Sequence, residues 1–310
     1  MTSPSTPYRG ASVALGSMHG KERAIAAPLR RALGASLIVP SGIDTDAYGT
    51  FTGEVERYGT MLEAARAKAR LAMAATGLPL GIASEGSYGP HPYLPLVAGG
   101  TELVLFIDDI RGLEIREALV VKRTNFDSQV CAPGDDIEGF LTRARFPTHA
   151  LVVQPHVPIE SRNLIEAALS AAPQTLLTPA TARHPVLFKG VRDRSHLLQA
   201  IETAATLSFD GKARLVTDMR AHLNPTRMAM IRTAATRLAR RIACLCPACA
   251  TPGFGLVDVA RGLPCADCGE PTSRLIAEIH RCSVCSFDRQ VPLRHAPQTA
   301  DPSYCDRCNP

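Results

Sequence analysis

The chain has 310 residues, of which 45% are hydrophobic and 20% charged, and its formal net charge at pH 7 is +5. This length allows two domains with a sizeable core, and so small an excess of positive charge does not by itself indicate a nucleic-acid-binding protein. Because the sequence shows neither a signal peptide nor the roughly 20 apolar residues that span a bilayer, we expect a cytoplasmic protein with reduced cysteines and no membrane contact.

Apolar, strand-like runs alternate with helical patterns through the first 245 residues. The runs that predict strands are Val13 to Gly16, Ser36 to Val39, Leu80 to Ser84, Glu102 to Ile107, Ala118 to Val121, Ala150 to Val153 and Pro185 to Phe188. The helical patterns cover residues 21 to 33, 60 to 76, 135 to 145, 162 to 171 and 195 to 207. This alternation predicts an α/β domain over residues 1 to 244, with helices packed on a mixed or parallel sheet. The domain could form two lobes, about residues 1 to 112 and 113 to 244.

The helix that begins after Thr60 is the most clearly marked. Thr60 and Glu63 form a T-x-x-E capping box, and Gly77 ends the helix. Lys68 lies on its apolar stripe, where a lysine either extends to solvent or contacts an anion.

A further helix is predicted from Pro225 to Ile242, with Asn224 as its N-cap. One face is apolar and should be buried. The opposite face, expected to be exposed, carries Arg227, Arg237, Arg240 and Arg241.

Two polar clusters predict anion binding at helix starts. Residues 17 to 21 follow a predicted strand and precede a helix, whose first amides, together with His19 and Lys21, could hold an anion. Near the end of the domain, Arg220 and Arg227 flank another helix N-terminus and could bind a phosphate or a carboxylate. The alternatives are a simple turn for the first cluster and an interdomain salt-bridge network for the second.

Two further clusters carry carboxylates. Residues 44 to 57 contain Asp44, Asp46, Glu54 and Arg57. Clustered carboxylates suit a hard cation such as Mg²⁺, although a solvated loop would have the same composition. Residues 82 to 92 place Glu85 after a strand, at the edge where α/β sheets bind ligands, and His91 in a glycine- and proline-rich loop of the kind that often carries function.

Eight of the ten cysteines form four C-x-x-C pairs. The pairs are Cys246/Cys249, Cys265/Cys268, Cys282/Cys285 and Cys305/Cys308. Two such turns complete one tetrahedral zinc site, so we predict a module over residues 245 to 310 with two structural zinc ions. Sequential, interleaved and nested pairings all satisfy the ligand count, and we favour the sequential one.

The zinc module is predicted to stabilise the fold or to dock a protein partner. Eight thiolates close both sites, whereas a catalytic zinc keeps an open position. Acidic residues slightly outnumber basic ones from residue 246 onward, and aromatic residues are few. Both features disfavour nucleic acid as the partner of this module.

The chain as a whole resembles an uncharacterised bacterial family, a domain of unknown function with a C-terminal twin zinc ribbon. The resemblance rests on the segments DTDAYGTFTGEVER, IASEGSYGPHP and DMRAHLNPTR and on the cysteine-rich ending that includes GLPCADCGEPT. It covers nearly the whole chain and implies no activity.

Residues 12 to 108 also resemble the inosine/xanthosine triphosphate pyrophosphatases. Those proteins begin with a strand, a T-x-N-P-x-K-type loop and a helix, and later have an E-x-A-x-x-K-A helix before a strand that ends in an Mg²⁺-binding acidic residue. Here residues 17 to 21 stand in place of the loop, which is one residue shorter in this chain. Residues 63 to 69 roughly follow the helix motif, and Glu85 follows the strand. The resemblance implies Mg²⁺-dependent hydrolysis of a nucleotide phosphoanhydride bond.

Two classes of function therefore remain. In the first, the α/β domain binds an anionic or phosphorylated small molecule and hydrolyses it. There, Glu85, Asp44, Asp46 and Glu54 would hold the metal, Lys21, Lys68 and Arg57 the phosphates, and His91 would shuttle a proton. The alternative is a non-enzymatic adaptor or sensor that docks a protein through the zinc module or a nucleic acid through the arginine-bearing helix.

Overall fold

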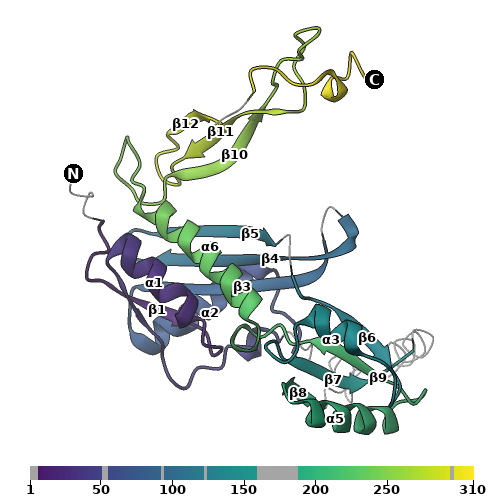
Figure 1. The fold of residues 1–310 in the computed structure, drawn as a ribbon. Helices are drawn as coiled ribbons and strands as arrows, with labels where there is room; N and C mark the ends of the chain where they lie inside the picture. Colours follow the sequence, from purple (N-terminus) through teal and green to yellow (C-terminus); the bar gives the residue numbers. More distant parts are fainter. Residues whose placement is uncertain (1–5, 51–54, 92–93, 122–123, 159–187, 294–296) are drawn as a thin grey trace, which may run out of the picture. The chain divides into compact units, whose positions relative to one another are not determined.

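The computed structural model describes residues 6–50, 55–91, 94–121, 124–158, 188–293 and 297–310. The chain divides into an α/β unit, Tyr8–Leu238, and a cysteine-rich unit that includes Ala239–Pro310. The α/β unit combines a mixed sheet with flanking helices, which confirms the predicted fold class (Figure 1). The helix expected at residues 162 to 171 lies outside the described residues.

The larger sheet of the α/β unit has five strands in the order β2-β1-β3-β4-β5. Their bounds are β1 Ser12–Gly16, β2 Ser36–Ile38, β3 Leu80–His91, β4 Leu94–Asp108 and β5 Leu113–Val121. β1 pairs in parallel with β2 and β3, whereas β3, β4 and β5 are antiparallel neighbours. The parallel half therefore follows the βα pattern of the sequence, and the rest of the sheet is a meander.

Strand β3 is longer than the sequence predicts, because the segment expected as a loop after Glu85 continues the strand to His91. Glycines weaken a strand, but here an aromatic ring covers one of them. A Cβ atom on Gly100 of β4 would lie 2.6 Å from the ring of Tyr88 on β3. Such a cross-strand contact stabilises the pair, and Gly100 serves packing instead of forming a loop.

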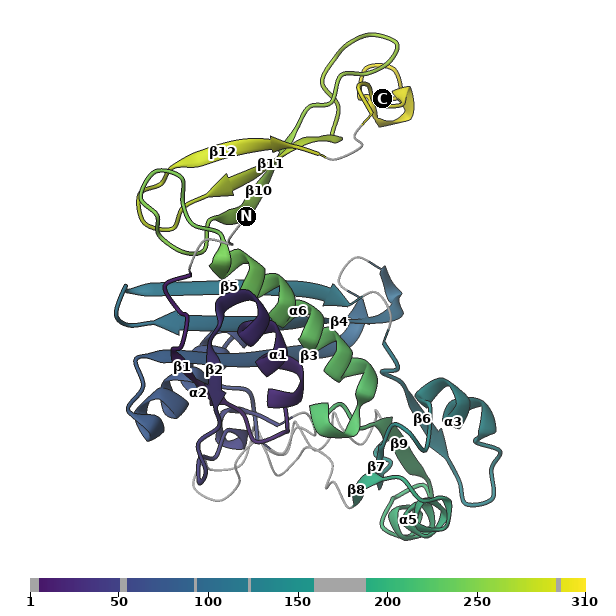
Figure 2. The ribbon, with the colours of Figure 1, turned by 60° about the vertical axis from the view of Figure 1, so that its left-hand side comes forward.

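Helices cover both faces of the larger sheet. Figures 1 and 2 show α1 (Glu22–Leu33) and α6 (Pro225–Ala243) on one face and α2 (Met61–Thr76) on the other. The small side chains of α2 pack on alternate residues of the strands in a cluster that includes Ala65, Ala69, Ala72, Ala14, Ala83, Leu103 and Leu105. This alternation is the period-two pattern of a sheet buried on both faces.

The predicted capping box of α2 is confirmed. The Thr60 hydroxyl accepts a hydrogen bond from the Glu63 amide at 3.3 Å, and the Glu63 carboxylate accepts one from the Thr60 amide at 2.7 Å. Gly77 follows the helix in the left-handed conformation, with φ of 68°, as expected of a C-terminal glycine.

A second, four-stranded antiparallel sheet belongs to the same unit, in the order β6-β9-β7-β8. Its strands are β6 Ser128–Cys131, β7 Leu151–Pro155, β8 Phe188–Val191 and β9 Ala213–Thr217. Helices α3 (Glu138–Ala144) and α5 (Arg194–Thr206) pack with it around a core of aliphatic residues and Phe140. β6 and β9 were not predicted as strands, because the apolar run of β6 is only two residues long and that of β9 is interrupted by Arg214. A 3₁₀ turn, η3 (Ala221–Leu223), leads from β9 into α6.

The cysteine-rich unit contains a three-stranded antiparallel sheet. Its strands are β10 Gly255–Arg261, β11 Leu275–Arg281 and β12 Asp288–Pro292, and a 3₁₀ turn, η4 (Pro302–Tyr304), follows. Across the described part of the chain, no helix has both the length and the apolar character that crossing a membrane requires.

Candidate functional site

The eight cysteines of the C-x-x-C pairs form two groups in the cysteine-rich unit. One consists of Cys246, Cys249, Cys282 and Cys285, the other of Cys265, Cys268, Cys305 and Cys308. Facing Sγ atoms from different pairs lie 3.6–3.9 Å apart. Four sulfurs at about 2.3 Å from a tetrahedral zinc would lie about 3.8 Å apart, whereas a disulfide needs about 2.05 Å. Each group could therefore hold one metal ion, and its donor set fits zinc.

The C-x-x-C pairs combine in an interleaved order, so the sequential pairing favoured from the sequence is wrong. β10 and β11 are antiparallel, with Gly255 opposite Arg281. The first pair precedes β10 and the third follows β11, so they meet at one end of the sheet, while the second and fourth meet elsewhere. The 7 residues of β10 separate the first C-x-x-C pair from the second by roughly 20 Å. Cysteines this far apart cannot bind the same ion.

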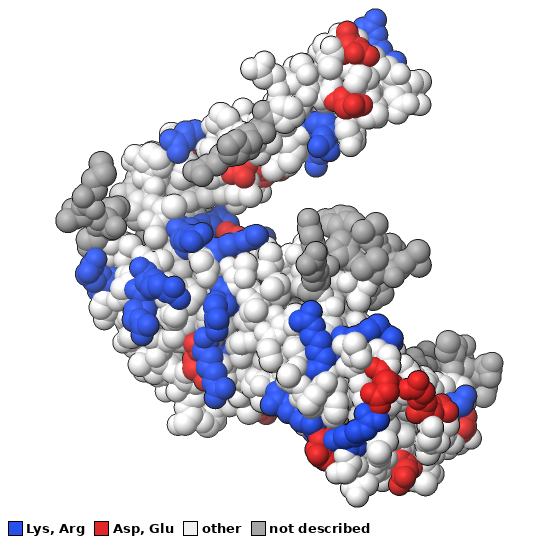
Figure 3. Space-filling view, in the orientation of Figure 1, with Lys and Arg blue, Asp and Glu red and all other residues white. Residues whose placement is uncertain are grey.

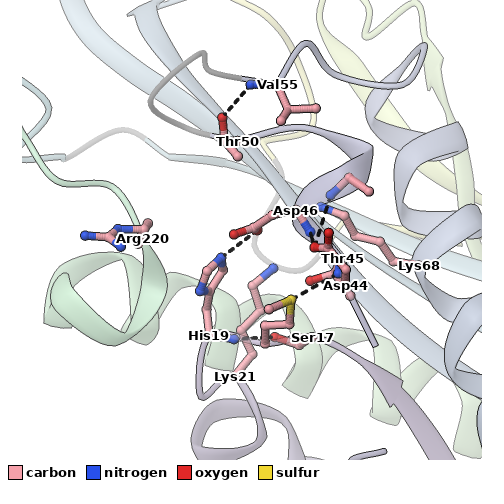
Figure 4. A network of polar contacts seen from close by, with 12 residues as sticks. Ser17, His19, Lys21, Asp44, Thr45, Asp46, Thr50, Val55, Lys68 and Arg220 are labelled. Atoms are coloured by element: carbon pink, nitrogen blue, oxygen red, sulfur yellow. Dashed lines mark hydrogen bonds and ion pairs between the residues drawn. The ribbon is translucent and has the colours of Figure 1, made fainter. Parts of the chain in front are cut away.

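A pocket in the α/β unit collects most of the other predicted residues. It is lined by His19, Lys21, Asp46, Gly49, Thr50, Lys68, Glu85, Lys189, Arg220 and Arg227. Counting the part open to solvent, about 490 Å³ is not filled by protein atoms, within the range of small-molecule sites. Five lysines and arginines face two carboxylates, so the lining favours an anionic ligand. Figure 4 shows part of this constellation, with the His19–Asp46 contact and Lys21 beside it.

Lys21 enters the pocket from the start of α1. Gly20, with φ of 65°, turns the preceding loop into the helix. The Lys21 ammonium donates a hydrogen bond to the Ser84 carbonyl at 2.7 Å. Burial, aided by the charges of Arg227 and Lys68, lowers the pKa of Lys21 to about 8. This lysine is therefore protonated at pH 7 but begins to lose its proton only slightly above it.

Lys68 of α2 and Glu85 of β3 form an ion pair with exposed fractions of 7% and 4%. Of the two environments expected for Lys68, the structure shows contact with an anion, here a carboxylate of the protein. Burial raises the pKa of Glu85, but the charges of Lys21 and Lys68 outweigh it and hold that pKa below its usual range. Glu85 is thus ionised and shared between two ammonium groups.

Arg227 is buried, which corrects its predicted place on the exposed face of α6. Its Nε lies 2.6 Å from Glu102 Oε1 on β4, and its Nη1 donates to the Met219 carbonyl at 2.5 Å. The apolar pattern of one helix carries no information about a buried carboxylate on another element. For this reason the sequence predicted, wrongly, that Arg227 is exposed. Arg237 and Arg240 are exposed as predicted.

The Arg227–Glu102 pair is enclosed by β3. Tyr88 donates its hydroxyl to Glu102 Oε1 at 2.8 Å, and a Cβ atom on Gly86 would lie 2.6 Å from the same oxygen. Gly86 therefore leaves the space that the ion pair occupies. Nearby, Arg220 contacts Asp218 through two nitrogens, the shorter distance being 2.7 Å. This contact fixes the Arg220 guanidinium group in the lining of the pocket.

His19 is oriented by a carboxylate. Its Nε2 lies 3.0 Å from Asp46 Oδ1, and its ring stacks on that of His222 with centroids 5.2 Å apart. Burial lowers the pKa of His19, although Asp46 opposes this, and burial also lowers the pKa of His222. Both rings are therefore neutral at pH 7, and His19 is available to accept a proton.

Some predicted residues lie beside the pocket instead of lining it. The Asp44 carboxylate accepts amide hydrogen bonds at 2.9 and 3.3 Å from the 3₁₀ turn η1 (Asp46–Tyr48), which it caps. Arg57 donates to the Gly86 carbonyl at 2.7 Å. Glu54 and the side chain of His91 lie outside the described residues.

Two charged residues of the site were not singled out from the sequence. Lys189 lines the pocket from β8, and Glu102, fully buried, holds Arg227. The sequence could have indicated both as site residues, because each is a charged residue at the end of a predicted apolar strand, as Glu85 is.

A Mg²⁺ ion held by protein ligands alone does not fit the described part of the pocket. Among the described residues, the groups of three or more His, Cys, Asp or Glu able to hold a metal are the two cysteine groups. Glu85 and Asp46 are engaged with Lys68 and His19. Because Mg²⁺ is often bound by one or two carboxylates plus substrate phosphates, it could enter only together with a phosphate ligand.

Comparison with known proteins identifies one family. The family model described as a domain of unknown function, DUF6671, matches residues 68–172 and 162–310 of the chain. A search of curated proteins finds no relative that matches.

Proposed function

The chain belongs to this family of unknown function, and from its own geometry we propose that the α/β unit binds a phosphorylated small molecule in the cationic pocket. The observation that carries the proposal is the convergence of five cationic side chains from five separate places in the fold. Lys21, Lys68 and Arg227 among them have exposed fractions of 7% or less. Buried charges are costly unless they are compensated, and an anion among them would relieve their mutual repulsion.

Carboxylates of the protein supply part of this compensation. Lys68, Arg220 and Arg227 each contact one carboxylate. Lys21 instead donates to a neutral backbone carbonyl. The lining as a whole holds five lysines and arginines against two carboxylates, and a ligand with two or more negative charges, such as a diphosphate group, matches this excess. Arginine forks also suit the several acceptor oxygens of a phosphate.

The binding proposal is tested by titration calorimetry of the zinc-loaded full chain with pyrophosphate and with nucleoside mono-, di- and triphosphates. We expect affinity to rise with the number of phosphates. Arg220→Gln should weaken binding about tenfold or more, because a hydrogen bond to a charged group contributes about 1.5–3 kcal/mol. The matched control is Lys212→Gln, an exposed cation outside the lining, which should bind normally. Absence of binding to all of these anions excludes the proposal.

The more specific version is hydrolysis of a nucleotide phosphoanhydride bond. It is supported by the common location of Lys21, Lys68 and Glu85, the positions on which the resemblance to triphosphate pyrophosphatases rests. Neutral His19, held by Asp46, would take a proton from the attacking water. The cations would stabilise the charge that develops on the phosphate oxygens. Mg²⁺ arriving with the nucleotide would supply additional charge neutralisation.

Glu85→Gln separates binding from hydrolysis. Removing this carboxylate frees Lys68, so simple phosphate binding should tighten or persist. If Glu85 contacts a nucleotide-bound Mg²⁺, the same change should lower metal-dependent release of phosphate or pyrophosphate by at least about tenfold. Hydrolysis is excluded if a nucleotide panel with Mg²⁺ or Mn²⁺ yields neither product.

For the cysteine-rich unit we propose two structural zinc ions, since four thiolates close each site. A closed site leaves no position for substrate, so the module would stabilise its own fold or present a docking surface to a protein. The requirement for free thiolates also leads us to propose a reducing compartment, the cytoplasm.

A further inference from the structure

Helices α1 and α6 lie side by side on one face of the larger sheet (Figures 1 and 2). Arg232 of α6 donates a hydrogen bond across this boundary to the Arg23 carbonyl of α1 at 3.5 Å. Within the α/β unit, the two helices expose arginines that we call the arginine face, namely Arg23, Arg30, Arg31, Arg232 and Arg237. Figure 3 shows Lys and Arg side chains gathered over these helices, with few Asp or Glu side chains among them.

The charge of the arginine face is not neutralised by neighbouring carboxylates in the described part of the chain. Among the described residues, none of its five arginines forms an ion pair with an Asp or Glu side chain; Arg31 and Arg232 donate only to backbone carbonyls. Several other exposed arginines of the unit are paired, as Arg66 is with Glu114, Arg70 with Asp109, Arg143 with Asp127 and Arg194 with Glu138. The charge of the arginine face is therefore left for an external polyanion.

We propose that the arginine face binds the phosphate backbone of a double-stranded nucleic acid, independently of base sequence. Arginine presents a fork of donors that matches phosphate oxygens, and contacts of this kind position a protein on a duplex without reading bases. Arg23 and Arg30 lie roughly 10 Å apart along α1, which equals the axial rise of about three base pairs. Both can therefore meet phosphates of one strand, while α6 supplies further contacts.

Composition disfavours two other anionic partners. Neither α1 nor α6 contains an aromatic residue, so the face lacks the rings on which single-stranded bases stack. The large apolar side chains that are exposed in the described chain all belong to other elements, so the face has no groups to insert into a lipid surface. None of the five arginines lines the pocket, and binding here is independent of the small-molecule site.

The test is fluorescence anisotropy of labelled 20-base-pair DNA and RNA duplexes with the zinc-loaded full chain, in salt from 50 to 200 mM. The logarithm of affinity should fall linearly with the logarithm of salt concentration, by about 0.9 per phosphate contact. Arg23→Gln/Arg30→Gln/Arg232→Gln should lower the slope by about 2 to 3 and weaken binding about tenfold or more at 50 mM. The matched control, Arg66→Gln/Arg70→Gln/Arg143→Gln, removes equal charge from paired sites and should change neither quantity appreciably.

Three results overturn the proposal: no duplex binding at 50 mM salt, an equal loss in the control variant, or tighter binding to phosphatidylserine vesicles or polyglutamate than to a duplex of the same charge. If the triple variant has a lower Tm than the unmodified protein, the single Arg→Gln variants replace it. Each single variant should then lower the slope by about 0.9, and unchanged slopes in all three also overturn the proposal.

Discussion

Gly16 on β1 lies against the backbone of Lys68 on α2, so closely that a Cβ atom on Gly16 would lie 2.2 Å from the Lys68 carbonyl oxygen. This approach brings the Lys68 side chain within reach of Glu85. Gly16→Ala should displace α2, lower the free energy of unfolding by about 1–3 kcal/mol and weaken anion binding in the pocket. Urea denaturation and calorimetry would measure both effects.

The matched control for Gly16 is Gly89 on β3. An added Cβ atom there meets nothing within 4 Å, so Gly89→Ala should leave stability and binding nearly unchanged. Equal effects of the two substitutions would show that the close approach of α2 is not what positions Lys68.

The buried pair of Arg227 and Glu102 should show strong coupling. Arg227→Met leaves Glu102 charged and fully buried, which typically costs about 3–5 kcal/mol. In the double variant Arg227→Met/Glu102→Leu no charge is left without compensation, so the protein should regain much of that stability. Thermal or urea unfolding of the four proteins forms the double-mutant cycle. A strictly additive cycle would contradict the pairing.

Anion binding should weaken as the pH rises above about 8. Burial and neighbouring cations lower the pKa of Lys21 to about 8, so below this pH the ligand meets an ammonium group and no proton is taken up. Above it, binding must return a proton to Lys21, and affinity should fall by up to about tenfold per pH unit. Calorimetry with a nucleoside triphosphate at pH 7, 8 and 9 measures the change.

Lys21→Met provides the comparison for this pH dependence. It should bind more weakly at pH 7 and show a flat profile from pH 7 to 9. If Lys21→Met kept the pH dependence of the unmodified protein, the titration of another group would be its cause.

Zinc stoichiometry distinguishes the pairings of the C-x-x-C motifs. Cys246 and Cys282 belong to one group, whereas Cys265 belongs to the other. Cys246→Ala/Cys282→Ala should therefore lose one ion of two, and Cys246→Ala/Cys265→Ala should lose both. Sequential pairing predicts the opposite pattern, so elemental analysis of the two variants decides between them.

Features that depend on neighbours in the chain could be predicted from the sequence. The capping box of α2 involves residues three positions apart, and each C-x-x-C turn brings two thiolates together locally. The start of α6 at Pro225 and the apolar periods of β1, α2 and α5 are of the same kind. Such elements arise from local hydrogen bonding and from the burial of one face, which a single sequence displays.

The convergence of the lining residues on one pocket was not visible in this way. Lys189 and Arg220 belong to strands and turns of the second sheet, and they meet Lys21 only because that sheet packs in the same unit. Arg227 was expected at the surface because its partner Glu102 is 125 positions away in the chain. The extension of β3 similarly depended on Tyr88 covering a glycine of the adjacent strand.

The sequence by itself therefore determined the eight cysteines that form the two groups, the mixed α/β class and the best-capped helices, because local chemistry specifies them. The tertiary structure alone decided which C-x-x-C pairs share a site, which charges meet in the pocket, and that α1 and α6 present their arginines together. These outcomes depend on strand direction and on contacts between distant segments, which long-range packing selects and local patterns leave open.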